Sequence, residues 1–187
     1  MLISEPSKIE ARPARERILL TAYRLFYQAG IRATGVDRVI AEAKVTKVTF
    51  YRHFPSKNAL VFEFLEYRHQ RWMEWFTQAL ARHGGNLAAL VPTLGEWLRD
   101  ADFRGCAFIN SVGELGGAIP EINGITRRHK REMKAAIAAL LSDQDEKKAA
   151  ETAEIIGMAV DGAIVGAQFA ESVDAVLDTL RMLVDEL

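Results

Sequence analysis

Apolar residues recur at intervals of three and four along most of this chain, which is the spacing that gathers them on one face of a helix. Between residues 15 and 29 the positions that follow it are Ile18, Leu19, Ala22, Leu25 and Phe26, and Gly30 is suited to end that helix. The same spacing predicts a long helix over residues 57–82 and further helices over 87–99, 106–115, 120–141, 146–170 and 173–187. Pro92 is expected to kink its helix. We therefore expect an all-α protein with about nine helices.

Residues 34–57 predict two short helices joined by a tight turn, which is the arrangement of a helix-turn-helix. Thr34 and Asp37 have the three-residue spacing of a reduced capping box, so the Thr34 hydroxyl is expected to accept a backbone N–H at the start of the first helix. The turn falls at Lys44, and Thr46 is suited to cap the second helix.

The second helix, predicted over residues 47–54, has an inward and an outward side. Phe50 and Phe54 lie one turn apart and are expected to face the core, and the helix ends there because a proline follows. The outward positions carry positive charges, a hydroxyl, an aliphatic group and a phenol: Lys47, Val48, Thr49, Tyr51 and Arg52. Such groups suit phosphate oxygens and base edges in the major groove of DNA. Ser56 is suited to cap the following helix, where Lys57 is expected to hold a phosphate.

The segment TGVDRVIAEA, followed by FYRHFPSKNAL within residues 15–65, resembles the DNA-binding domain of the TetR/AcrR family of transcriptional regulators. The resemblance implies a three-helix helix-turn-helix head over residues 12–60 and a helical regulatory, ligand-binding and dimerisation domain over residues 61–187. Two positions depart from the family pattern: Lys44 stands where a glycine is usual, and Val48 where a small residue is common. A lysine with a left-handed backbone costs about 1 kcal/mol, so we expect a strained or reshaped turn.

The residues expected to contact DNA come from both short helices and the start of the long one. They are Thr34, Gly35, Lys47, Val48, Thr49, Tyr51, Arg52, His53 and Lys57. A helical hairpin that only packs against its neighbours would not need this polar and aromatic outer face. Residues 1–57 hold 11 basic and 5 acidic residues, whereas the rest of the chain holds 13 basic and 20 acidic ones. The positive charge is therefore concentrated where phosphate binding is expected.

A homodimer formed by the last two helices is a second implication of the resemblance. The helix predicted over residues 146–170 contains glycines at 157, 162 and 166, and each costs about 1 kcal/mol relative to alanine unless close helix packing offsets it. The expected interface residues are Ile155, Gly162, Gly166, Val176 and Leu180. Packing inside one chain is the alternative explanation. In a dimer, two recognition helices about 34 Å apart read a palindrome in successive major grooves.

The regulatory domain of this family usually binds a small apolar or amphipathic ligand, and the resemblance implies such a site here. Its aromatic and apolar lining is expected from Trp72, Trp75, Phe76, Trp97, Phe103, Phe108, Met158 and Phe169. The polar groups expected to orient the ligand are Asn110, Glu114, Asp161 and Gln168. Taken one at a time, these aromatic residues are better explained by core packing than by ligand contact, so the hypothesis concerns the set.

Nothing in the sequence predicts catalysis, a cofactor or a metal site. The four histidines do not cluster, and no Ser-His-Asp arrangement, glycine-rich phosphate loop or carboxylate pair is present. The single cysteine, Cys106, fits a reducing compartment and is better explained as a small buried apolar residue than as a redox sensor. The amino terminus has no signal-peptide pattern, and no apolar run is long enough to span a bilayer. We expect a cytoplasmic protein with no membrane partner.

The sequence thus favours a non-enzymatic, homodimeric DNA-binding transcriptional regulator. Its expected partners are a double-stranded DNA operator, a second copy of the chain and a small-molecule effector. Repression that is relieved by the effector is the preferred mechanism, because a ligand that prefers one conformation can change the spacing of the two recognition helices. Two alternatives remain open: an activator with the same head, and a helical small-molecule binding protein with an altered head.

Overall fold

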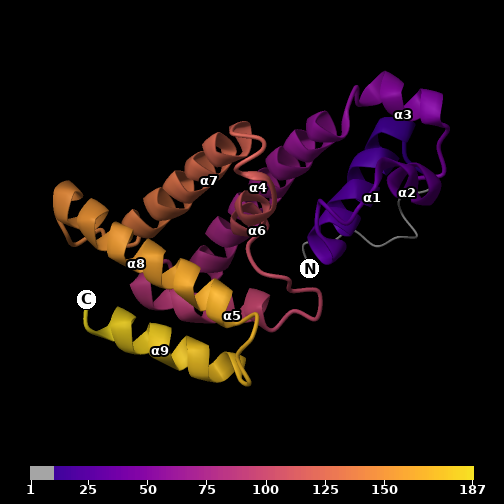
Figure 1. Cartoon of the computed structure of the whole chain (residues 1–187). Coiled ribbons are helices and arrows are strands. Elements are labelled where there is room, and N and C mark those ends of the chain that lie inside the picture. The colour runs from indigo at the N-terminus through magenta and orange to yellow at the C-terminus, as the bar shows by residue number, and fades with distance from the viewer. Residues whose placement is uncertain (1–10) are drawn as a thin grey trace. The chain divides into compact units, whose positions relative to one another are not determined.

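The computed structural model describes residues 11–187 and contains nine α-helices and a short 3-10 helix over that range, which confirms the all-α prediction. The chain divides into two compact units. One runs to Gln70 and also includes Ala107–Ile125, and the other holds Arg71–Cys106 and Thr126–Leu187. Figure 1 labels the helices.

The first unit is built around three short helices and the start of a long one. They are α1 (Ala14–Ala29), α2 (Val36–Glu42), α3 (Lys47–His53) and the first half of α4 (Lys57–Arg82), which is joined by α6 (Ala107–Leu115). Phe26 and Tyr23 of α1 pack edge-to-face against Phe64 of α4, with ring centroids 5.5 and 5.8 Å apart. These three rings are buried and form the centre of this unit.

A buried arginine also joins α1 to α4. Arg68 is almost fully buried, donates a hydrogen bond of 2.6 Å from Nη1 to the Tyr23 hydroxyl, and stacks over the Tyr27 ring at 4.1 Å. A buried charge is tolerated where it is hydrogen-bonded and lies over aromatic faces. These contacts therefore fix the orientation of α4 relative to α1.

The second unit is also helical. It holds the rest of α4, the 3-10 helix η2 (Leu87–Ala89), α5 (Leu90–Leu98), most of α7 (Glu121–Ala138), α8 (Glu146–Gly166) and α9 (Val173–Asp185). In Figure 1, α8 and α9 run side by side at the carboxyl end of the chain. Asp145 and Ser172 cap these two helices by accepting backbone N–H groups.

The expected kink at Pro92 is wrong. Residues 87–89 form the 3-10 turn η2, and the α-helix begins only at Leu90, so Pro92 falls in the first turn of α5. A residue in the first turn has no intrahelical acceptor for its N–H, and a proline there breaks no hydrogen bond. The chain therefore starts α5 at a position where proline is tolerated.

Lys44 is the one residue other than glycine with a positive φ in residues 11–187, at 52°. The left-handed backbone expected at this departure from the family pattern is thus confirmed. The connection stays short, since four residues, 43–46, separate the end of α2 from the start of α3. The lysine side chain is exposed.

We predict that Lys44→Gly raises the free energy of unfolding by about 0.5–1 kcal/mol, since glycine adopts a positive φ without a steric penalty. Part of the gain is lost to the greater freedom of glycine in the unfolded chain. Urea denaturation at a fixed protein concentration measures the change. Ala41→Gly, on the exposed face of α2, is the matched control and should lower stability by about 1 kcal/mol. Equal destabilisation by both substitutions would contradict the assignment of strain to Lys44.

Candidate nucleic-acid interface

The α2–α3 turn is held from behind by an arginine of α1. Arg17 donates from Nε to the Ala43 carbonyl at 3.1 Å and from Nη2 to the Lys44 carbonyl at 3.2 Å. These carbonyls follow the end of α2, where no intrahelical donor remains for them. The sequence pattern did not reveal this role, because Arg17 lies 26 residues before Ala43 in the chain.

Thr46 caps α3, as predicted. Its side-chain oxygen accepts the Thr49 backbone N–H at 3.1 Å, and the two threonine hydroxyl oxygens lie 2.9 Å apart. The Thr49 hydroxyl is therefore engaged in the cap of its own helix. Its methyl group is the part of this half-buried side chain that stays available for other contacts.

The inward and outward sides of α3 are those expected from the sequence. Phe50 and the following Phe54 are buried, and the Tyr51 ring rests edge-to-face on Phe50 with centroids 5.2 Å apart. The exposed outer face carries Lys47, Val48, Tyr51 and Arg52, while Thr49 and His53 are half-buried. Val48 is 70% exposed and Tyr51 is 44% exposed. The helix thus presents two cations, a phenol and an aliphatic group on one side.

The capping box expected at Thr34 is wrong. Gly35 occupies the N-cap of α2, and no side chain makes a hydrogen bond there. The Thr34 side chain is fully buried, and its hydroxyl donates to the Gly30 carbonyl at 2.8 Å. A carbonyl exposed by the end of α1 therefore takes the hydroxyl that the sequence pattern assigned to α2. Of the two residues expected to contact DNA here, Gly35 is exposed, whereas Thr34 offers only its backbone.

Lys57 lies at the first position of α4, and Ser56 caps that helix by accepting the Ala59 N–H at 3.1 Å. Burial lowers the pKa of the Lys57 ammonium, and the negative charge of Glu114 opposes this effect. The ammonium is half-buried and stands beside the positive end of a helix, where an anion is stabilised. Phosphate binding by Lys57 stays a prediction.

Glu114 of α6 contacts the connection between α1 and α2. Its carboxylate accepts the Arg32 backbone N–H at 2.7 Å. It also lies 3.3 Å from the point that a Cβ on Gly30 would occupy, and Gly30 has a φ of 87°. The connection between α1 and α2 is therefore fitted closely around this carboxylate.

Glu42 at the end of α2 links two arginines. Its carboxylate pairs with Arg38 at 2.9 Å on the same helix and with Arg24 of α1. The hydrogen bond from Arg38, opposed by partial burial and assisted by Arg24, lowers the pKa of Glu42. The pair with Arg24 adds a polar tie between α1 and α2 to the apolar contacts of Val39.

Five of the residues expected to bind a ligand come together in the second unit. Trp72 stacks on Phe76 with centroids 4.6 Å apart and meets Trp75 and Trp97 edge-to-face at 5.9 and 5.6 Å. Phe103 continues the group by contacting Trp97 at 5.4 Å. We call Trp72, Trp75, Phe76, Trp97 and Phe103 the aromatic cluster. His129 of α7 lies against it, with its ring centroid 5.0 Å from that of Trp72.

Three buried polar atoms of uncharged side chains in the second unit have no hydrogen-bond partner among the described residues. They are Trp72 Nε1, Thr93 Oγ1 and Thr126 Oγ1. A buried donor without an acceptor costs about 1–3 kcal/mol. Such atoms mark places where a water or a ligand would supply the missing contact.

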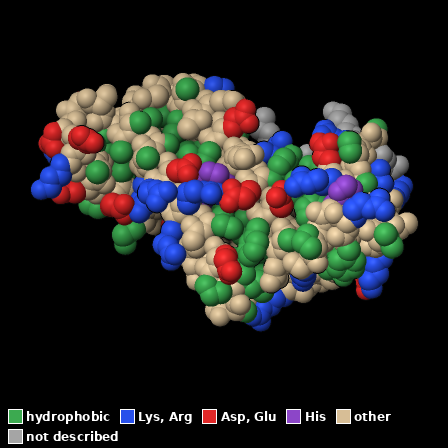
Figure 2. Space-filling model, turned by 90° about the horizontal axis from the view of Figure 1, so that it is seen from above, with side chains coloured by type: hydrophobic (Ala, Val, Ile, Leu, Met, Phe, Trp, Pro, Cys, Tyr) green, Lys and Arg blue, Asp and Glu red, His purple; other side chains and the backbone are tan. Residues whose placement is uncertain are grey.

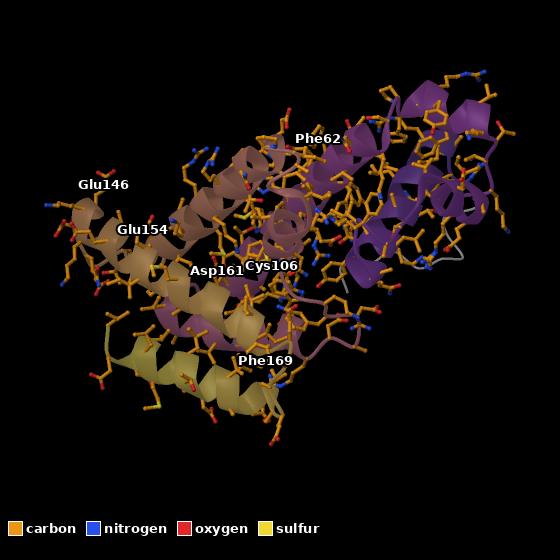
Figure 3. All side chains as sticks on the ribbon, viewed as in Figure 1. Phe62, Cys106, Glu146, Glu154, Asp161 and Phe169 are labelled. Atoms are coloured by element: carbon orange, nitrogen blue, oxygen red, sulfur yellow. The ribbon has the colours of Figure 1, made fainter. Side chains whose placement is uncertain are left out.

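The other residues expected to bind a ligand are not members of the aromatic cluster. Phe108, Asn110 and Glu114 belong to α6 in the first unit. Asp161 pairs with Lys130 of α7, and Gln168 is exposed next to Gly105. Met158 and Phe169 are 74% and 79% exposed. Figure 3 labels Asp161 on α8 and Phe169 just beyond its end.

Exposed apolar residues of α8, together with Gly162 and with Phe169 just beyond the end of the helix, follow a regular spacing of three and four. They are Ile155, Met158, Gly162, Val165 and Phe169, and we call them the α8 stripe. Beside it, a groove between α8 and α9 is lined by Ala159, Gly162, Ala163, Gly166, Val176, Thr179, Leu180 and Leu183. The stripe has the repeat by which two helices pack knobs into holes.

No helix within residues 11–187 has the length and apolar content needed to cross a membrane. Over the same range, no group of three or more His, Cys, Asp or Glu side chains is placed to hold a metal ion. Figure 2 shows blue Lys and Arg side chains at both ends of this face and between them, with red Asp and Glu side chains among them.

The family model for bacterial regulatory proteins of the tetR family matches residues 18–64. A transcriptional repressor of Escherichia coli K12, NemR, is 28% identical over 106 residues, which cover 54% of this chain and 53% of NemR. An uncharacterized HTH-type transcriptional regulator of Bacillus subtilis, YerO, is 42% identical over 53 residues, which cover 28% of this chain and 18% of YerO. The chain thus spans about half or less of the length of these curated relatives.

A solved structure covers far more of the chain. SCO4454, a TetR-family transcriptional regulator from Streptomyces coelicolor, is 30% identical and covers 92% of this chain, and the match spans 93% of SCO4454 with a TM-score of 0.80. The similarity therefore extends beyond the helix-turn-helix to nearly all nine helices. This chain belongs to the tetR family of bacterial regulatory proteins.

Proposed function

We propose that the protein is a sequence-specific DNA-binding regulator that acts in the cytoplasm as a homodimeric repressor and leaves its operator when a small apolar or amphipathic ligand binds. The observation that carries this proposal is the outer face of α3. A seven-residue helix held by buried Phe50 and Phe54 exposes Lys47, Val48, Tyr51 and Arg52 together. Cations that can bind phosphates, beside side chains that can contact base edges, are the combination with which a helix binds in the major groove of DNA.

The proposed DNA contacts divide into phosphate and base contacts. Lys47, Arg52, His53 and Lys57 supply positive charge or N–H donors to phosphates, and Tyr51 donates its hydroxyl to another. Thr49, through its methyl group, and Val48 face the bases. Gly35 approaches the DNA backbone, and Thr34 contributes through its main chain because its side chain is buried. A head over residues 12–60 and a regulatory domain over 61–187 complete the proposal, with α4 continuous from one to the other.

The α8 stripe supports the proposed dimer. Met158 and Phe169 are large apolar side chains that are mostly exposed to solvent. Together with Ile155 they follow the spacing that places residues on one side of a helix. Gly157 is explained by the chain itself, because the Lys134 side chain occupies the space that its Cβ would fill. Gly162 has no atom within 4 Å of that point. A second chain packed on this face, with Gly166, Val176 and Leu180 in the groove, would offset the cost of Gly162.

The aromatic cluster supports the proposed effector site. Rings from α4 and α5 and the loop after α5 meet there, and the Trp72 N–H provides a donor that an effector's polar group would satisfy. An apolar or amphipathic molecule with one acceptor fits this combination. NemR is named a repressor, which favours repression over activation. A helical binding protein with an altered head remains the alternative, and the turn geometry retained at Lys44 weighs against it.

Selection of bound sequences from a random double-stranded DNA pool, at near-physiological salt, tests the proposed function. We expect a two-fold symmetric motif, because two α3 helices read successive major grooves. Arg52→Ala should weaken binding to all sequences and reduce the slope of log affinity against log salt by about 1 for each lost phosphate contact. Arg127→Ala, an exposed arginine of α7, is the control and should leave the slope unchanged. Absence of any enriched motif would sink the regulator proposal.

The dimer proposal predicts that Met158→Asp and Phe169→Asp each raise the dimer dissociation constant about 100-fold or more, because a charge is then buried on both sides of a two-fold interface. Sedimentation velocity over a concentration series measures this. Ala150→Asp places the same charge on an exposed position of α8 outside the stripe and should leave the dimer intact. If both stripe variants remain dimeric at the wild-type concentration, the interface lies elsewhere.

The effector site can be tested by fluorescence, since all three tryptophans of the chain belong to the aromatic cluster. Compounds that release the selected DNA should also shift or quench tryptophan emission. Trp97→Phe should weaken effector binding about tenfold while leaving DNA affinity unchanged without effector, because Trp97 lies in the second unit. A releasing compound that leaves the emission unchanged would place its site away from the cluster.

A further inference from the structure

Val48 is the exception on the outer face of α3. Its neighbours there are charged or carry a hydroxyl, yet its side chain is aliphatic and the most exposed apolar one on the helix. Residues 11–187 provide no cover for it. An exposed valine also lowers helix propensity slightly, because β-branching restricts χ1. Neither helix stability nor the packing of the described residues therefore explains why a valine stands at this position.

The threonine beside it is less available for base hydrogen bonds than its sequence suggests. Thr49 donates its backbone N–H to Thr46, and their hydroxyls lie 2.9 Å apart within the helix cap. In a helix-turn-helix the first residues of the recognition helix face the base edges. With the Thr46 and Thr49 hydroxyls engaged, Lys47 and Val48 are the outward side chains left at that end of α3.

The chemistry of base edges limits what Val48 can face. Guanine O6 and N7, adenine N6 and N7, and cytosine N4 are polar, and a valine packed on them would leave a donor or acceptor without a hydrogen bond. The thymine C5-methyl group is the one apolar group that the four standard bases present in the major groove. A β-branched side chain holds its two methyl groups in one preferred rotamer in a helix, so little freedom is lost on contact.

We propose that Val48 selects a thymine: each half-site of the operator carries a T·A pair whose C5-methyl group packs against the Val48 side chain. This inference rests on the proposed function and adds a specific base to it. Lys47 and Arg52 then supply affinity through charge, while Val48 supplies discrimination at one base pair. The departure from the small residue common at this position is thereby assigned a role in operator choice.

The test uses the full-length protein and the motif obtained by selection. Each thymine of a half-site is replaced in turn by deoxyuridine, which pairs with adenine in the same way and lacks only the C5-methyl group. Dissociation constants are measured by fluorescence anisotropy for wild type, Val48→Ala and Val48→Thr. For wild type, one thymine per half-site should lose about fourfold in affinity on replacement, the value of one buried methyl-sized group.

Val48→Ala should bind thymine and deoxyuridine equally at that position, while Val48→Thr, which keeps one methyl group, should retain part of the preference. Val112→Ala, an exposed valine of α6, is the matched control and should keep the full wild-type sensitivity. Because Val48 is exposed, its truncation should not unfold the head, and circular dichroism checks this.

The two levels of the proposal fail in different ways. If wild type binds the selected motif but no thymine is sensitive to deoxyuridine, or if Val48→Ala keeps the same sensitivity, Val48 does not read a methyl group and the regulator proposal stands. If no motif is selected and no DNA is bound above background, the proposed function itself is overturned.

Discussion

Burial of Phe50 and Phe54 is the interaction on which the head of this protein depends. A helix of seven residues is far too short to be stable alone, because nucleation costs more than a few hydrogen bonds return. The two rings place α3 on the core of the first unit, with Arg15 of α1 over the Phe54 ring at 5.3 Å. The same register that turns these rings inward turns Lys47, Val48, Tyr51 and Arg52 outward. Anchoring and the exposed face are therefore consequences of one helical periodicity.

Features that depend on neighbours in sequence could be predicted. The caps at Thr46 and Ser56 and the bounds of α4 follow from residues within one turn of each other. Thr34 shows where this reasoning fails, since a carbonyl four residues earlier takes its hydroxyl before α2 begins. Arg17 and Arg68 could not be assigned from the sequence, because their partners lie 26 and 45 residues away.

The candidate ligand residues also divide into those whose grouping depends on neighbours in sequence and those whose grouping depends on distant residues. Trp72, Trp75 and Phe76 share one stretch of α4, so their meeting with Trp97 needed only that α5 pack nearby. Met158 and Phe169 were grouped with them because an apolar residue on a helix gives no indication of which partner covers it. Their exposure separates them from the cluster and aligns them with Ile155 instead. A single sequence specifies that a face is apolar, but only the packing reveals whether the chain covers that face itself.

The two departures from the family pattern, at Lys44 and Val48, have different physical effects. Lys44 adopts the backbone conformation that a glycine would adopt, and Arg17 holds the carbonyls of the turn, so the substitution changes stability and leaves the geometry of the turn. Val48 changes no backbone feature, because it lies inside α3. What it changes is the chemistry of the outer face, where a smaller side chain would leave space. A turn that keeps its shape and a face that changes its chemistry are the conditions under which one fold recognises a different DNA sequence.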